Sequence, residues 1–494
     1  MYYRGKIYDN YQEYLEAIKE GSQIMPYSSS QNDTLISTPP TYTPPTYTQP
    51  TYTAPTYTQP TYTTSTSTET LTDTAIESER KKYYVRGLSG LKNQGNTCYM
   101  NSVLQCLSSI DIFRAYLIEG KYADRLYYNV LLKLGDEKRK KESIPDDVNV
   151  KIPRAQVDNK FQNTIVSRLA ELLKIMWEQN VTVNPKSFKK VAGENCSLFS
   201  GYAQNDSQEL LNLILDRIHE ETKSDSIKIK HPSMSDGVKN YLQVKSQCVE
   251  KTNDEMGSPE EKQKYLKYLS EYTKTHITDS IISESYLYWK KFISSSHSVI
   301  TNLFSGLYYS KITCSECKSI TNSFEPFTMM SLETKENGET TLEESLKSFV
   351  NDELLTGDNQ YFCCECQKKV DATKKMHIWA PPNVLVIQLK RFKNDKHIAT
   401  KTSSKVVFPI ENLDLKDYMS ELFTVDKTKY DLVAISEHRG SCNCGHYVAY
   451  SRNSINNEWY EFNDDDIFRV PYDELAKEII TKNAYLLFYV RKLD

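Results

Sequence analysis

Two Cys-x-x-Cys pairs, CSEC at residues 314–317 and CCEC at residues 363–366, constrain the fold of this chain more than any other feature. Four thiolates from two such pairs suit a tetrahedral zinc ion with no open coordination position, which is a structural site. The 45 residues that separate the pairs are consistent with two hairpin tips that meet in space. The expected ligands are Cys314, Cys317, Cys363 and Cys366. A thioredoxin-like redox pair would need a βαβ unit that is absent here, and unliganded cysteines are the other alternative.

The overall composition narrows the class of protein. The chain has 494 residues, eleven cysteines and a formal net charge of −4. This balance gives no electrostatic case for nucleic acid or an anionic membrane as a partner. No run approaches the roughly 18 apolar residues that span a bilayer, and the first residues lead into no apolar signal segment. We therefore expect an intracellular protein, cytoplasmic or nuclear, that is a monomer.

The first 85 residues differ in composition from the rest. Residues 40–64 repeat a five-residue unit, Pro-Thr-Tyr-Thr followed by one variable residue, and a Thr/Ser-rich stretch follows. A proline at every fifth position withholds a backbone donor, and little aliphatic bulk is present to offset the entropy of ordering. We expect residues 1–85 to be disordered and to act as a spacer, with a tyrosine-presenting docking array as the alternative. A short helix over residues 9–18 is also expected.

Residues 86–494 are expected to form one catalytic domain of the α+β class. Apolar residues at helical spacing predict helices over residues 98–110, 161–177 and 206–219. Residues 222–280 are charged and helical in pattern, and Ser258-Pro259 begins a helix well, so we expect a helical insertion there. After residue 300 the pattern changes to short strands rich in β-branched and aromatic residues. The predicted strands are 301–313, 384–389, 430–437, 446–451, 459–462 and 484–489.

The segment GLKNQGNTCYMNS at residues 90–102 carries the strongest chemical signal. Cys98 lies where a glycine-bearing loop turns into a helix, and the free N–H groups of a helix amino terminus stabilise a thiolate. A thiolate is the nucleophile that acyl transfer needs. Asn93, five residues earlier, is a neutral donor that can face the oxyanion formed when the thiolate attacks a carbonyl. A buried structural cysteine is the alternative.

A base and an orienting group for such a nucleophile occur near the carboxyl end. His446 follows a glycine and begins a predicted strand, and Asn463 lies in the next one. Two adjacent antiparallel strands would bring the two side chains together, and an asparagine oxygen can hold an imidazole tautomer by accepting its N–H. A histidine of purely structural role is the alternative. Cys442 and Cys444 could bind a metal with His446, but that metal would compete with its action as a base.

Six motifs of this chain resemble motifs of the ubiquitin-specific proteases, a family of papain-like deubiquitinases, and they occur in the order found in that family. They are the segment around Cys98, GYAQNDSQELL at residues 201–211, LFSG at 303–306, LKRF at 389–392, GHYVAY at 445–450, and WYEFNDD at 459–465. The sequence departs from the family pattern at Cys444, where a glycine is common. The resemblance covers residues 86 to 492.

The resemblance implies a papain-like fold with a helical thumb, a β-sheet palm and zinc-tipped fingers. It also implies that Asn463 is the third catalytic member, with Asp464 in support. Asp206, with Gln204 and Gln208 of the same motif, would contact the ubiquitin tail.

The expected activity is hydrolysis of the isopeptide or peptide bond after the carboxyl-terminal glycine of ubiquitin, by a cysteine-type ubiquitinyl hydrolase without a catalytic cofactor. The partners would be ubiquitin and ubiquitinated proteins. Two alternatives remain: a protease for a ubiquitin-like modifier, and a non-catalytic ubiquitin-binding scaffold.

Overall fold

The computed structural model describes most of residues 85–492 and two short strands near the amino terminus, β1 (Tyr2–Tyr3) and β2 (Lys6–Ile7). Within residues 85–492 it leaves out 146–147, 149, 225–233, 254–256, 396–397, 423–424, 426 and 443. The expected helix over residues 9–18 and the repeats at 40–64 lie outside the described residues. None of the helices in the described part is long and apolar enough to cross a membrane.

A lobe of helices forms the thumb. Its helices are α3 (Cys98–Ser108), α4 (Asp111–Ile118), α7 (Ile165–Gln179), α8 (Lys186–Asn195), α9 (Ser207–Thr222) and the short α13 (Val299–Leu303). Their apolar stripes meet in one core, where Val103, Leu169 and Ile214 are fully buried. Each such side chain contributes about 1.5–3 kcal/mol when fully buried.

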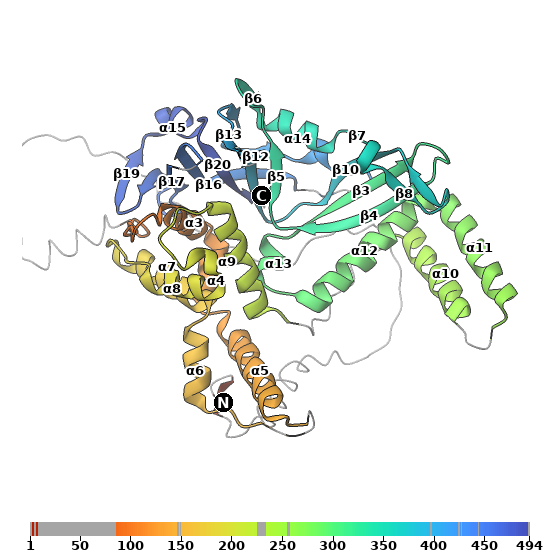
Figure 1. Ribbon diagram of the computed structural model, residues 1–494, viewed down its shortest axis with the longest axis horizontal. Coiled ribbons are helices and arrows are strands. Elements are labelled where there is room, and N and C mark those ends of the chain that lie inside the picture. Colours follow the sequence, from red (N-terminus) through yellow and green to blue (C-terminus); the bar gives the residue numbers. More distant parts are fainter. Residues whose placement is uncertain are drawn as a thin grey trace, which may run out of the picture.

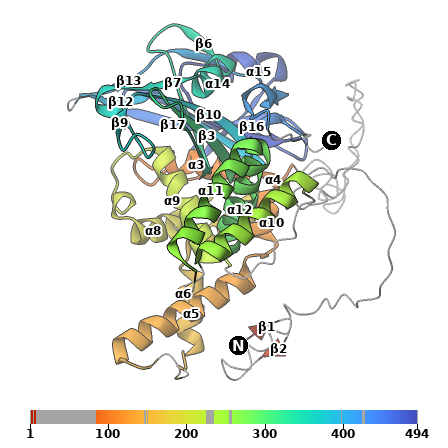
Figure 2. The same cartoon turned by 90° about the vertical axis from the view of Figure 1, so that its right-hand side faces the viewer.

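The palm is an eight-stranded sheet that lies against the thumb (Figure 1). Its strand order is β19 (Asp466–Val470), β18 (Trp459–Asn463), β17 (Gly445–Arg452), β16 (Lys429–Gly440), β20 (Ala484–Arg491), β11 (Val384–Lys390) and β5 (Met330–Glu333), with β15 (Leu413–Asp414) paired to β16. Helix α3 packs against β17 and β16, and the Ser102 and Ser436 hydroxyls lie 3.0 Å apart across that contact. This packing brings the start of α3 to the palm. Figure 2 shows the same two layers from the side, with the sheet above the helices.

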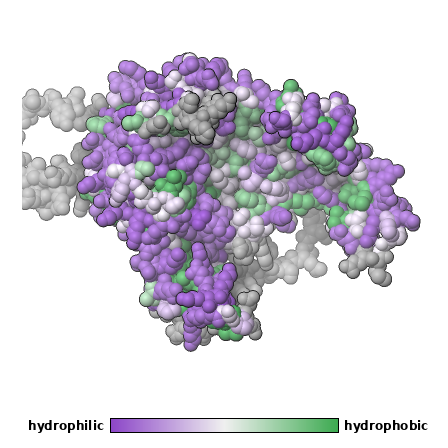
Figure 3. Space-filling view, viewed as in Figure 1, coloured by the Kyte–Doolittle hydropathy of each residue, from purple (hydrophilic) through white to green (hydrophobic). Residues whose placement is uncertain are grey.

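The fingers are a second, four-stranded sheet in the order β4 (Ile320–Phe327), β3 (Gly306–Cys314), β10 (Ala372–Ala380) and β7 (Glu353–Leu355). One face packs on α12 (Ile277–Ser296), where Ile281 meets Phe324 and Trp379. The hairpin of β8 (Tyr361–Cys363) and β9 (Lys368–Val370) stands at the tip. On the face seen in Figure 3, hydrophilic residues cover most of the thumb, and hydrophobic residues are visible between the thumb and the far end of the fingers.

Two helical hairpins extend from this framework (Figure 1). One consists of α10 (Asp236–Asn253) and α11 (Pro259–Thr275). Helix α11 begins with a capping box, in which the side chains of Ser258 and Glu261 each accept the other's backbone N–H. The other, α5 (Ala123–Glu142) with α6 (Arg154–Gln162), projects from the thumb and was not foreseen from the sequence.

The remaining elements are short. They are β6 (Glu339–Thr341), α14 (Leu342–Val350), β12 (Phe392–Asp395), β13 (Ile398–Lys401), β14 (Lys405–Val407) and α15 (Tyr472–Ile479), with single 3₁₀ turns at Ser197–Phe199, Gly357–Asn359 and Lys416–Tyr418.

The fold class expected from the sequence, α+β with thumb, palm and fingers, is confirmed. One predicted strand was wrong in its first part: residues 301–303 belong to helix α13, and β3 begins only at Gly306. The reason is a local cap, because the Ser298 side chain accepts hydrogen bonds from the backbone of Ile300 and Thr301. Such a capping box favours a helix even where the following residues prefer strands.

Candidate active site

Cys98 is the first residue of α3 and lies where thumb and palm meet. The preceding loop turns sharply, since Gly95 and Asn96 both have positive φ angles, 97° and 52°. Glycine and asparagine adopt this left-handed conformation most readily. The backbone N–H groups of Met100 and Asn101 then bond to the Thr97 carbonyl, which starts the helix. The thiol is therefore held at a helix amino terminus, and its residue is 3% exposed.

His446 reaches Cys98 from strand β17. The hydrogen-bonding contact with Cys98 raises the pKa of His446 to about 9, with further contributions from the Asn463 bond and the Asp464 charge, against a lowering by burial. The Nε2 atom of the imidazole lies 2.7 Å from Oδ1 of Asn463. Strands β17 and β18 are antiparallel neighbours, with Ala449 opposite Phe462, and this pairing brings the two side chains together. The thiol of Cys98, the imidazole of His446 and the carboxamide of Asn463 thus form one chain of contacts in space.

Asp464 occupies the tight turn between β18 and β19, with a φ angle of 53°. Its carboxylate accepts hydrogen bonds from Nδ2 of Asn93 at 2.9 Å and from Nδ2 of Asn101 at 2.7 Å. Its carbonyl accepts the N–H of Leu91 at 2.7 Å, and Oδ2 lies 4.0 Å from Nε2 of His446. The tip of this hairpin therefore contacts both the histidine and the loop before Cys98.

The side chain of Asn93 is fixed at both ends. Its Oδ1 accepts the backbone N–H of Gly95 at 2.9 Å and of Thr97 at 3.1 Å, while its Nδ2 donates to Asp464. A carboxamide nitrogen carries two N–H bonds, so one remains after the bond to Asp464. That donor belongs to the loop that leads directly to Cys98.

The three residues expected to meet a substrate tail lie at the start of α9. Asp206 caps this helix by accepting the N–H of Gln208. Its two carboxylate oxygens share the single O–H of Tyr485, at 2.9 and 2.8 Å. Burial raises the pKa of Asp206, and the Tyr485 bond opposes that rise. The carboxylate is thus held in place from the palm side.

Gln204 bridges the thumb and the palm. Its Nε2 donates to the Gly445 carbonyl at 2.9 Å, and its Oε1 accepts the Gly445 N–H at 3.3 Å. Strand β18 pairs with β17 only from Ala449 onward, so it does not bond to the backbone of Gly445. The carboxamide of Gln204 bonds to that backbone N–H and C=O instead, at a position where another extended chain could pair. The glycine itself is required here, because a Cβ at this position would overlap the imidazole of His438.

Three residues next to the site were not singled out from the sequence: His438, Tyr485 and Asn101. His438 is buried between Phe392 and Tyr447, and this burial lowers its pKa to about 4. Only the cross-strand register, in which His438 lies opposite Tyr447, brings it beside the catalytic segment. Asn101 had a usable signal, since it lies one helical turn after Cys98 in the same motif.

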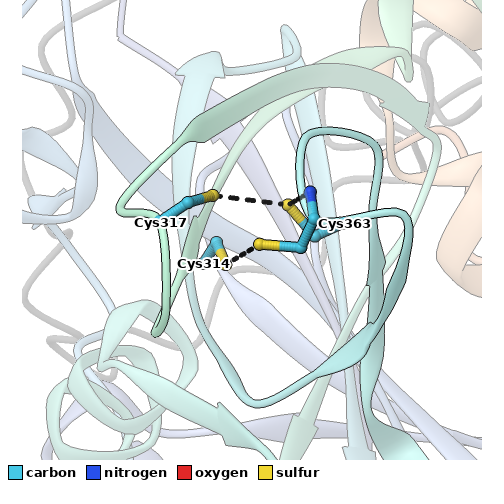
Figure 4. A group of neighbouring side chains, drawn as sticks. Cys314, Cys317 and Cys363 are labelled. Carbon is cyan, nitrogen blue, oxygen red and sulfur yellow. Dashed lines mark hydrogen bonds between the residues drawn. The ribbon is translucent and has the colours of Figure 1, made fainter.

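The four expected zinc ligands come together at the tip of the fingers. Their sulfur atoms all lie within 4.8 Å of one another, and the Cys314–Cys366 and Cys317–Cys363 sulfur pairs are 3.9 and 3.6 Å apart. Ligands at about 2.3 Å in tetrahedral geometry have edges of about 3.8 Å. In Figure 4, Cys317 points at Cys363 from the opposite hairpin. The donor set and its spacing therefore fit a tetrahedral metal ion such as zinc.

Breaking the cysteine cluster is expected to abolish metal binding and to destabilise the fingers, while the reactivity of the Cys98 thiol stays unchanged. A Cys363→Ser variant should lose the bound zinc, about one ion per chain, and melt at a lower temperature, while alkylation of Cys98 by iodoacetamide keeps its rate. Elemental analysis and a thermal melt measure the two effects. Cys364→Ser is the matched control, because Cys364 is exposed and outside the cluster. Equal metal loss from both variants would contradict the assignment.

A thiol, imidazole and carboxamide at the junction of a helical lobe and a sheet define the class of papain-like cysteine peptidases. The family model described as ubiquitin carboxyl-terminal hydrolase matches residues 89–489. The chain belongs to this family, and it is a deubiquitinating cysteine peptidase.

Individual relatives agree with this assignment. The chain is 32% identical over 430 residues to a probable ubiquitin carboxyl-terminal hydrolase of Acanthamoeba polyphaga mimivirus, covering 82% of this chain and 90% of the viral protein. It is 29% identical over 408 residues to human ubiquitin carboxyl-terminal hydrolase 2, covering 82% of this chain and 55% of the human protein.

Among solved structures, the fold is similar to that of the SAGA Ubp8/Sgf11/Sus1/Sgf73 DUB module bound to ubiquitin aldehyde. The TM-score is 0.53 at 22% identity, with 85% of this chain and 76% of that chain covered. At this identity the similarity concerns the fold alone.

Proposed function

We propose that Cys98, His446 and Asn463 are the catalytic residues of this deubiquitinase, and that they cleave the bond after the carboxyl-terminal glycine of ubiquitin. The observation that carries the proposal is the connected set of contacts from Cys98 through His446 to Asn463, made by residues from distant parts of the sequence. In the first step His446 takes the proton of the Cys98 thiol and becomes an imidazolium. The Cys98 sulfur then attacks the glycine carbonyl, and the Asn93 amide donates to the oxyanion. His446 protonates the leaving lysine amine, which breaks the C–N bond and leaves a thioester.

The second half of the reaction uses the same residues. His446, now neutral, accepts a proton from a water molecule that attacks the thioester carbonyl. The C–S bond breaks, the thiolate–imidazolium pair returns, and ubiquitin leaves with a new carboxyl group that releases its proton to solvent. Asn463 keeps the imidazole oriented, and Asp464 supports both His446 and Asn93. Asp206, Gln204 and Gln208 would contact the tail of ubiquitin.

The rest of the organisation follows as part of the same proposal. Residues 86–494 form the catalytic domain, with a helical insertion at 222–280, and residues 1–85 form a separate amino-terminal region. One structural zinc ion binds the four finger cysteines. The enzyme works as an intracellular monomer, in the cytoplasm or nucleus, where thiols stay reduced.

The pH dependence of turnover is expected to reflect His446. Because its pKa is raised to about 9, the imidazolium persists at neutral pH and loses its proton as the pH rises through that value. Without this proton the leaving amine is not protonated, so kcat/KM should fall about tenfold per pH unit above about pH 9. Steady-state rates across the alkaline range measure it. In Asn463→Ala the fall should begin at lower pH, because the lost hydrogen bond helps raise the pKa of His446. If the alkaline part of the pH–rate profile were the same in wild type and variant, the assignment to His446 would be contradicted.

Substrate choice is tested with matched fluorogenic amides of ubiquitin and of ubiquitin-like modifiers. The proposal expects kcat/KM for ubiquitin to exceed that for each other modifier by at least about 100-fold, or about 2.7 kcal/mol. Faster cleavage of another modifier would favour the alternative of a ubiquitin-like protease. Binding of ubiquitin without any cleavage by the full chain would favour the scaffold alternative.

A further inference from the structure

Asn101 is a buried carboxamide that the reaction steps above leave without a role. It lies on α3 one turn after Cys98 and is 2% exposed. Its Nδ2 donates to the Leu91 carbonyl at 3.0 Å and to Oδ1 of Asp464 at 2.7 Å. Within the described residues, its own Oδ1 has no hydrogen-bond partner. An unsatisfied buried oxygen destabilises the fold.

The bond from Asn101 fixes the orientation of the Asp464 carboxylate. Asn101 holds one carboxylate oxygen and Asn93 holds the other. Hydrogen bonds to an ionised acceptor are shorter and stronger than bonds between neutral groups. If the bond from Asn101 is removed, only the bond from Asn93 still holds the carboxylate, which can then turn about its Cβ–Cγ bond.

The orientation of Asp464 in turn decides where the Asn93 amide points. The oxygen end of that amide is tied to the loop by the N–H groups of Gly95 and Thr97, and the nitrogen end is tied to Asp464. With both ends fixed, the second N–H of Asn93 has a single direction. An oxyanion donor is effective only when its direction is set before the reaction.

We propose that Asn101 is a positioning residue for the oxyanion site: through Asp464, it orients the donor N–H of Asn93. This inference rests on the proposed role of Asn93. It predicts that Asn101 affects stabilisation of the tetrahedral intermediate and leaves both the Cys98–His446 pair and the binding of ubiquitin unchanged.

A purely structural role for Asn101 would have a different signature, and the chain offers a matched control. Gln105 lies one turn further along α3, is 3% exposed, and donates its Nε2 to the Ser89 carbonyl at 2.7 Å. It therefore anchors the same helix to the same segment by the same chemistry, but it does not contact Asp464. Removing either amide costs a helix-to-loop bond, and only Asn101→Leu removes the bond to the carboxylate.

The experiment compares Asn101→Leu, Gln105→Met and Asn93→Ala in the full chain by three measurements. The first is kcat and KM for a ubiquitin fluorogenic amide. The second is the rate of Cys98 alkylation by iodoacetamide, a displacement that forms no oxyanion. The third is inhibition by ubiquitin aldehyde, whose adduct with a thiol places an oxygen where the oxyanion forms.

Asn101→Leu is expected to lower kcat by about 10- to 100-fold and to weaken aldehyde inhibition in proportion. KM and the alkylation rate should stay within about twofold, and Gln105→Met should keep all three values. The proposal is overturned if alkylation falls in parallel with kcat, or if Gln105→Met loses as much activity. If Asn93→Ala keeps its kcat, the oxyanion role of Asn93 itself fails. If Asn93→Ala loses kcat and Asn101→Leu keeps it, the failure is confined to this inference.

A second variant covers the case in which Asn101→Leu does not fold. Asn101→Asp places a second carboxyl group against Asp464, and the two can share one proton only at low pH. Its loss of kcat relative to wild type should therefore grow as the pH rises. A loss that is the same at every pH would contradict the proposal.

Discussion

Replacing Cys98 by alanine is expected to lower kcat for ubiquitin amides by at least about 10⁴-fold. The substitution removes the atom that forms the thioester, and the other thiol of the same helix is poorly suited to replace it. Cys106, on the same helix, is fully buried, and burial raises the pKa of its thiol well above the ordinary value. Burst-phase and steady-state assays with a fluorogenic ubiquitin amide measure the loss.

The same variant should still bind ubiquitin, because Cys98 is a small part of the surface between thumb and palm. Titration calorimetry with free ubiquitin is expected to give a dissociation constant within a few-fold of the wild-type value. The binding free energy would then differ by about 1 kcal/mol or less. Cys106→Ala is the control, since it removes a buried thiol from the same helix and should retain turnover. A Cys98→Ala enzyme that keeps even a tenth of the wild-type rate would show that another nucleophile operates.

Replacing His446 by alanine is expected to lower kcat/KM by about 10³- to 10⁴-fold. Two effects combine: Cys98 loses the imidazolium that stabilises its thiolate, and the leaving amine loses its proton donor. The alkylation rate of Cys98 at neutral pH should fall as well, which separates this variant from one that disturbs only the oxyanion site.

His276→Ala is the matched control for that result. His276 lies where α11 meets α12 and stacks on Tyr272, remote from the palm strands. Its removal should change neither the alkylation rate nor kcat/KM. If the two histidine variants behaved alike, His446 would not be the acid and base of this enzyme.

Local patterns in the sequence were sufficient for much of the fold. The palm strands at 384–390, 445–452 and 484–491 and the helices after Cys98 and Asp206 occur close to where hydrophobic periodicity predicted them. These elements are long and strongly patterned, so local preference and tertiary packing agree. The α5–α6 hairpin was not anticipated, because its charged sequence gives little indication of what it packs against.

In the candidate site, too, some residues could be predicted from the sequence and some contacts could not. Spacing alone pointed to the four finger cysteines, and adjacent strands pointed to His446 beside Asn463, which the structure places 2.7 Å apart. The contacts of Asp464 with Asn93 and Asn101, and of Gln204 with Gly445, depend on how one hairpin tip and one thumb loop dock. Such long-range contacts leave no periodic signal in the sequence.

The most direct test of the central claim uses ubiquitin that carries an electrophile at its carboxyl terminus, reacted in parallel with the wild-type chain and with Cys98→Ala. The account predicts a covalent adduct of the mass of one ubiquitin on the wild-type protein, located by peptide mapping at Cys98, and none on the variant. An adduct at another cysteine, or no adduct on a folded and zinc-loaded wild-type protein, would contradict the claim that Cys98 is the nucleophile of a ubiquitin-directed peptidase.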